Sequence, residues 1–263
     1  MATASWVSQI HFSALFILVH SLAAVAEEPK PASTGNGAGA ESVIKERSYQ
    51  KKLIEGWNVH VNDLLIQDEK AATDKMLEIL AAHLKEIVRV VPAGAVAHLR
   101  KVSLWLNPCY PGIKPSAEYH PSVGWLKAQK RNPDMARCVE FTDVLNFEAE
   151  TKRMPVVVLH ELAHAYHDQV LSFEQADIVA AYKKAVENKS YDKVQRWHGV
   201  SGRTTIERAY AMSNHKEYFA ECSEAFFGRN DFFPFTRDEL EKHDPEMFKL
   251  LHRLWNSTVE NSK

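Results

Sequence analysis

The segment that most constrains this chain is residues 155–170, "PVVVLHELAHAYHDQV", in which His160, Glu161 and His164 lie among uncharged side chains. The apolar flanks predict a largely buried helix, and Pro155 takes a first-turn position that proline tolerates. Residues four apart in a helix lie on the same face, one turn apart. The two histidines are therefore expected to point together into the interior of the fold.

The spacing His-Glu-x-x-His is that of a zinc site. Two imidazoles so placed can each reach one ion at about 2.0–2.1 Å, and the glutamate beside the first ligand can accept a proton from a water molecule that the ion activates. The alternative is a pair of histidines packed in a core, and the uncharged flanks favour the metal. We expect one Zn2+ ion per chain on His160 and His164, with Glu161 as the general base.

A catalytic zinc site needs a third protein ligand. His167 shares the helix face, but it lies about 10 Å along the axis from the first histidine and cannot bind the same ion; we expect a partly exposed polar residue. Residues 214–228, "NHKEYFAECSEAFFG", predict a largely buried helix that carries Glu217, Glu221 and Glu224. Buried carboxylates need partners, so one glutamate is expected to bind zinc and another to orient a histidine ligand.

The segment from Tyr210 to Glu221, "YAMSNHKEYFAE", resembles the signature of the anthrax lethal-factor-like gluzincins, which include Pro-Pro endopeptidases. These proteins pair H-E-x-x-H with a later Tyr-x6-Glu-[Phe/Tyr]-Phe-Ala-Glu segment, and Asp168 also matches their pattern. The resemblance covers roughly residues 100–230, leaving no room for the delivery domains of lethal factor. It implies that Glu217 is the third ligand, that Glu221 and Asp168 support the ligands, and that Tyr210 donates a hydrogen bond to the oxyanion.

Strand patterns come first in the chain and helical patterns follow, which predicts an α+β fold. Trp57, Val59 and Val61 alternate with polar neighbours, as in a half-buried strand. Further strands are expected within residues 101–106 and 137–147, and further helices within residues 68–91 and 173–188. The predicted architecture is zincin-like: a small mixed sheet with an edge strand, followed by the H-E-x-x-H helix and the glutamate-bearing helix.

Zincin sites present an edge strand to an extended substrate, and residues 136–144, "ARCVEFTDV", are expected to take that position. Tyr119, His120 and Trp125 either line the cleft or only anchor a loop, and the sequence leaves both interpretations open.

Residues 1–26 are predicted to be a signal peptide, because an apolar run ends in the small residues Ala24-Val25-Ala26. The alternative is a retained membrane anchor formed by residues 11–26. Residues 27–41 have the composition of a flexible linker, and residues 42–263 are expected to form the catalytic domain. Export would place the protein in the periplasm or outside the cell, where Cys109 and Cys138 could pair.

These features predict a secreted zinc metallopeptidase, an endopeptidase that binds an extended peptide or protein segment. The net charge of −2 gives no indication of nucleic-acid binding, and no stable membrane association is expected after signal cleavage. Two alternatives stay open: a zinc hydrolase of non-peptide amides such as cell-wall material, and a non-catalytic zinc-stabilised binding module. Glu161 and Tyr210 argue against the module, because a purely structural zinc site needs neither.

Overall fold

The computed structural model describes residues 48–111, 114–142 and 144–257. The chain divides into two compact units, Met1–Ala38 and Gly39–Lys263, and every described residue lies in the second. The predicted signal peptide (1–26), the alternative anchor (11–26) and the linker (27–41) lie outside the described residues and stay predictions.

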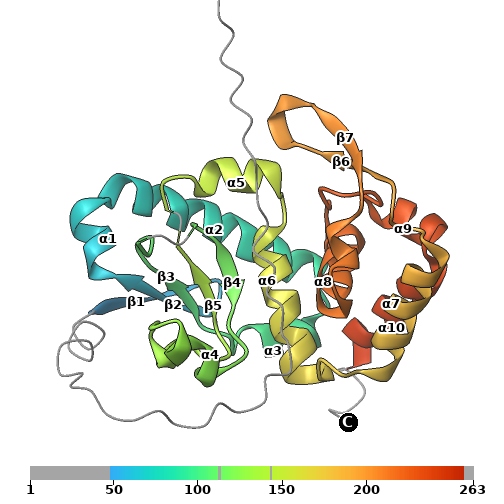
Figure 1. Cartoon of the computed structure of the whole chain (residues 1–263). Coiled ribbons are helices and arrows are strands. Elements are labelled where there is room, and N and C mark those ends of the chain that lie inside the picture. Colours follow the sequence, from blue (N-terminus) through green and yellow to red (C-terminus); the bar gives the residue numbers. More distant parts are fainter. Residues whose placement is uncertain (1–47, 112–113, 143, 258–263) are drawn as a thin grey trace, which may run out of the picture. The chain divides into compact units, whose positions relative to one another are not determined.

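A five-stranded mixed sheet forms one side of the second unit (Figure 1). Its strands are β1 (Tyr49–Ile54), β2 (Trp57–Asn62), β3 (Leu104–Leu106), β4 (Ala117–Tyr119) and β5 (Val139–Phe141). The spatial order is β1-β2-β3-β5-β4, with β2, β3 and β5 parallel and the two outer strands antiparallel to their neighbours. The α+β class and the small mixed sheet are confirmed.

The helices account for most of the remaining chain. They are α1 (Asp63–Asp68), α2 (Lys70–Val90), α3 (Ala93–Leu99), α4 (Val123–Ala128), α5 (Phe147–Arg153), α6 (Val157–Tyr166), α7 (Ala176–Asn188), α8 (His215–Phe227), α9 (Arg237–His243) and α10 (Pro245–Asn256). Short 3-10 helices are η1 (Pro133–Met135), η3 (Gly199–Ser201) and η4 (Tyr210–Met212), and the π-helix η2 (His167–Leu171) continues α6. No helix of the described residues has the length and apolar character to cross a membrane.

The pattern of apolar residues explains how the sheet is covered. Trp57 and Val59 of β2 are fully buried, whereas Asn58 between them is exposed. Met76 and Leu80 belong to the apolar stripe of α2 and lie in the same hydrophobic core as these strand residues. The main core therefore lies on the face of β2 that the alternation in the sequence predicts, while Trp105 of β3 belongs to a smaller cluster with Leu126 and Met135.

The strand at the edge of the sheet is not the predicted one. Residues 136–144 contain β5, but β5 pairs with β3 on one side and with β4 on the other. The expectation that this segment is the edge strand is wrong. The two edge strands are β1 and β4, and the edge beside α6 is formed by β4, three residues long, which lies earlier in the sequence than β5.

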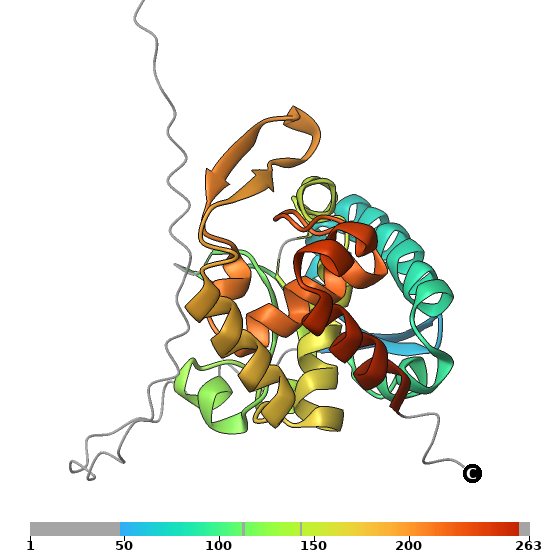
Figure 2. The ribbon, with the colours of Figure 1, turned by 90° about the vertical axis from the view of Figure 1, so that its right-hand side faces the viewer.

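The motif helix α6 lies between the sheet and the helices of the C-terminal half. It packs against β4 on one side and against α8 on the other (Figure 1). A second sheet, the hairpin of β6 (Val194–Trp197) and β7 (Thr204–Glu207), projects from the C-terminal helices (Figures 1 and 2), and its turn contacts α5. The hairpin leads through η4 into α8. Because α6 contacts both β4 and α8, chain segments from both halves meet at α6.

Cys109 and Cys138, both in the described part of the chain, form no disulfide in the structure. The thiol of Cys109 donates to the carbonyl oxygen of Thr142 at 2.8 Å. The pairing that an oxidising compartment would permit is therefore not part of this fold.

Candidate metal centre

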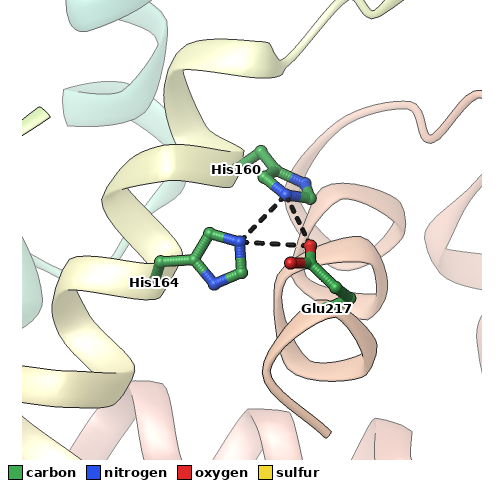
Figure 3. Close-up of side chains that lie close together, drawn as sticks. All are labelled: His160, His164 and Glu217. Atoms are coloured by element: carbon green, nitrogen blue, oxygen red, sulfur yellow. Dashed lines mark hydrogen bonds and ion pairs between the residues drawn. The ribbon is translucent and has the colours of Figure 1, made fainter. Parts of the chain in front are cut away.

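Three side chains from two neighbouring helices bring their ligand atoms together. His160 and His164 come from α6, and Glu217 comes from α8 (Figure 3). The two Nε2 atoms are 3.1 Å apart, and each lies 3.2 Å from Oε2 of Glu217. Ligand atoms around a tetrahedral zinc ion, each about 2.0–2.1 Å from it, should be roughly 3.3 Å apart. The three atoms therefore fit one ion and leave a fourth coordination position open.

The start of α8 determines where Glu217 lies. Oδ1 of the N-cap residue Asn214 accepts hydrogen bonds from the amides of Lys216 (2.9 Å) and Glu217 (3.1 Å). Glu217 thus falls in the first turn, where the helix N-terminus favours a negative charge. Burial acts to raise the pKa of its carboxyl, but His164 and His160 outweigh burial and lower that pKa well below the ordinary value. Glu217 therefore offers an ionised carboxylate as a candidate ligand.

The other ring nitrogen of His160 is bound by Glu224. Nδ1 of His160 donates to Oε1 of Glu224 at 2.6 Å, and both side chains are buried. With that proton on Nδ1, Nε2 is the ring nitrogen that can bind a metal, and it lies beside the carboxylate of Glu217. Burial acts to lower the pKa of His160, yet the Glu217 and Glu224 carboxylates raise it well above the ordinary value. The surroundings thus favour a positive charge here, and two imidazoles with a carboxylate are a donor set that zinc accepts.

Glu221, the residue expected to support a histidine ligand, lies beside this hydrogen bond. Its Oε1 is 3.9 Å from Nδ1 of His160, which is beyond hydrogen-bond distance. Burial, followed by the carboxylate of Glu224, raises the pKa of Glu221 well above its ordinary value. The sequence leaves open which glutamate of α8 orients the histidine, and the resemblance implies Glu221. The structure places Glu224 there, seven residues after Glu217 on the same face of the helix.

Glu161 lies next to the three ligand atoms and is held by the sheet. Its Oε2 accepts a hydrogen bond from the backbone amide of Tyr119 in β4, at 2.8 Å. Burial raises the pKa of Glu161, and the carboxylate of Glu217 raises it further. A carboxylate with a raised pKa is better suited to accept a proton near neutral pH than an ordinary glutamate.

Tyr210 approaches the same place from η4, directly before α8. Its side chain is half-buried, and burial raises the pKa of the phenol well above the ordinary value. The carboxylates of Glu217 and Glu161 raise that pKa further. The phenol is therefore protonated at neutral pH and available as a hydrogen-bond donor beside the candidate metal position.

Asp168 is bound by the edge strand of the sheet. Its Oδ2 accepts a hydrogen bond from the hydroxyl of Tyr119 at 2.6 Å. Gln169, the next residue, donates from Nε2 to the same hydroxyl at 3.1 Å. The structure thus brings Asp168 to the edge strand, whereas the resemblance implies that Asp168 supports the metal ligands.

His167 is fully buried, so the expectation of a partly exposed residue is wrong. Its ring lies against Phe173 and Phe219, with centroid distances of 5.2 and 4.8 Å. Within the described chain neither ring nitrogen has a hydrogen-bond partner. Burial, followed by the charge of His164, lowers the pKa of His167 to about 3. The ring belongs to the packing behind the site.

His120 and Trp125 take the anchoring role that the sequence left open. His120 is buried, and its Nε2 lies 2.8 Å from Oε2 of Glu140. Trp125 stacks on the His120 ring at a centroid distance of 5.2 Å and is 37% exposed. Glu118, His120 and Glu140 form a second group with ligand atoms close together. The guanidinium of Arg131 already bonds both carboxylates, at 2.5 and 3.1 Å, so this group is a neutralised structural network.

A histidine pair one turn apart, a carboxylate from a second helix and a buried glutamate beside them form the kind of centre found in metallopeptidases. Residues 140–256 match the family described as glucose-regulated metallo-peptidase M90. This stretch contains α6, η4 and α8 and hence the three candidate ligands, Glu161 and Tyr210. The match supports a metal-dependent peptidase.

Among solved structures, the chain is similar to a Pro-Pro endopeptidase from Paenibacillus alvei. The two are 17% identical with a TM-score of 0.39, over 67% of this chain and 89% of that one. No curated protein matches the chain. The lethal-factor-like part of the resemblance stays a prediction.

Proposed function

We propose that this protein is a secreted zinc endopeptidase with the metal on His160, His164 and Glu217. The observation that carries the proposal is the set of three ligand atoms, 3.1–3.2 Å apart, beside the buried carboxylate of Glu161. Zinc is favoured over harder cations because two of the three donors are imidazoles. Secretion rests on the sequence of residues 1–26 alone.

The protein side chains supply proton transfer and charge stabilisation. Bound zinc would polarise the scissile carbonyl and lower the pKa of a water molecule toward about 7. Glu161 accepts the proton of the attacking water and delivers it to the leaving amine. Tyr210 donates its phenolic hydrogen to the carbonyl oxygen as negative charge develops there. Both groups are protein acids or bases whose burial has already shifted their pKa values in the direction the chemistry needs.

The substrate that fits this arrangement is an extended peptide. The edge strand β4 lies against α6, and an edge strand offers unpaired amides and carbonyls to a further strand. A peptide paired with β4 would run past the candidate metal position in an extended conformation. The site therefore favours unfolded or loop segments of proteins.

The proposal is tested by digesting a random peptide library with the purified protein, with and without a chelator. Cleavage should depend on metal, and metal analysis should find one zinc ion per chain. The variant Glu161→Gln should keep zinc and fold but lose about 10²–10⁴-fold in rate. Undiminished cleavage by Glu161→Gln would refute the mechanism. A zinc-loaded wild type that cleaves no library peptide would favour a non-peptide amide or a binding module instead.

A further inference from the structure

The backbone groups of β4 alternate in direction. The amide of His120 and the carbonyl of Ser116 both bond to the β5 side, each at 2.9 Å. In an extended strand the residues between such positions turn their N–H and C=O groups the opposite way. The backbone N–H and C=O groups of Ala117 and Tyr119 therefore point outward from the edge of the sheet, on the side where Glu161 lies.

Tyr119 uses its outward groups to bind the motif helix and its continuation. Its amide donates to Glu161 at 2.8 Å, and its hydroxyl donates to Asp168 at 2.6 Å and accepts from Gln169 at 3.1 Å. Glu161 and Asp168 are seven residues apart, about 10 Å along a helix. One strand residue thus fixes the catalytic helix at two well-separated points.

The other face of β4 is anchored to the sheet. Glu118 binds the buried guanidinium of Arg131 at 2.5 Å, and His120 binds Glu140 at 2.8 Å. The residues on both sides of Tyr119 are therefore fixed by side-chain contacts to the sheet.

We propose that Tyr119 is a positioning residue that holds α6, and with it Glu161, at a fixed distance from the strand β4. This inference rests on the proposed function, since it concerns the same site and a peptide substrate.

The positioning role is tested by steady-state kinetics. A displacement of about 1 Å between the bound peptide and the catalytic groups costs on the order of 10²-fold in rate. Tyr119→Phe removes the bonds to Asp168 and Gln169 but keeps the ring and the backbone amide. It should lower kcat about 10- to 100-fold, with KM within about threefold and zinc content unchanged.

Tyr191→Phe is the matched control. Tyr191 is another buried tyrosine, and its hydroxyl lies 3.1 Å from Asp244 and 3.8 Å from the thiol of Cys222. Among the described residues, that hydroxyl makes no bond to β4, Asp168 or Glu161. Its loss should cost stability and leave kcat unchanged. Asp168→Ala should reproduce the Tyr119→Phe effect. Asp168→Asn should restore most of the turnover, because its amide oxygen still accepts the hydrogen bond from Tyr119. The double variant Tyr119→Phe/Asp168→Ala should be no slower than either single variant. A wild-type kcat for Tyr119→Phe, or equal loss in Tyr191→Phe, would overturn the positioning role.

Failure of this inference is distinguishable from failure of the proposed function. Glu161-dependent cleavage of a library peptide together with a wild-type kcat in Tyr119→Phe would overturn the positioning role and leave the proposed function standing. A wild type that cleaves no peptide would overturn both.

Discussion

At the scale of single residues, spacing alone predicts the α6 pair, whereas supporting residues depend on packing. Four residues of separation are enough to put His160 and His164 on one face of a helix. Which glutamate reaches Nδ1 of His160 depends on how α8 is rotated and shifted against α6. That relation comes from side chains between the helices, so the sequence pointed to Glu221 while the structure places Glu224 on His160.

The first prediction concerns this hydrogen bond. Glu224→Ala should weaken zinc binding about 10- to 100-fold, because His160 loses the acceptor that fixes its tautomer and ring orientation. Glu221→Ala, a buried carboxylate removed from the same helix, should have a smaller effect and serves as the control. Competition with a chromophoric chelator at fixed pH measures both affinities. A larger loss in Glu221→Ala would show that the metal-bound site uses the other glutamate.

Tyr210 permits a prediction about turnover. Tyr210→Phe leaves all three candidate ligands in place and removes one donor to the developing oxyanion. Because burial and nearby carboxylates raise the phenol pKa, the wild-type donor is present throughout the neutral range. The variant should keep its zinc and lose about 10²–10³-fold in kcat, with little change in KM. A kcat within twofold of wild type would remove Tyr210 from the mechanism.

At the scale of elements, the helices follow their sequence patterns, but the sheet edge does not. In β5, Val139 and Phe141 face one side, and Glu140 between them suggests an exposed face. Glu140 is nevertheless buried, because Asn107, Tyr110, His120 and Arg131 bond its two oxygens. A charged residue satisfied by partners far away in sequence is indistinguishable from a solvated one in the sequence. A three-residue strand such as β4 also carries too little pattern to be recognised.

An element-scale prediction follows from the N-cap of α8. Asn214→Ala removes the acceptor for the amides of Lys216 and Glu217, which should lower the free energy of unfolding by about 1 kcal/mol. Glu217 lies in that first turn, so zinc affinity should also fall. Asn214→Asp keeps a good capping oxygen and should behave as wild type in both measurements. Urea unfolding of zinc-free protein and metal titration give the two values, and an Asn214→Ala protein as stable as wild type would contradict the capping role.

At the scale of the whole molecule, the site is assembled from both halves of the described chain. The family match covers residues 140–256, which hold the candidate ligands, whereas β4 with Tyr119 lies upstream of it. The sheet thus supplies the strand that holds Glu161, and the helices supply the metal ligands. Such an assembly requires α6 to be packed on all sides. As a consequence, the ionisable ring of His167, directly after α6, is buried between aromatic side chains.

His167 should make the fold sensitive to mild acid. Its ordinary pKa is 6.5, and in the folded protein burial, followed by His164, His215 and Lys216, lowers the pKa to about 3. Between these two pKa values the imidazole is protonated in the unfolded chain and neutral in the folded protein. The contribution of His167 to the free energy of unfolding is therefore full above pH 6.5 and falls as the pH falls, by up to about 1.4 kcal/mol per pH unit. His167→Phe removes two unpaired buried nitrogens from an aromatic environment. It should be at least as stable as wild type at pH 7 and lose less stability at pH 5. Urea unfolding of both zinc-free proteins at several pH values isolates His167, because every other group titrates in both, and equal slopes would show that its ring is protonated in the folded state.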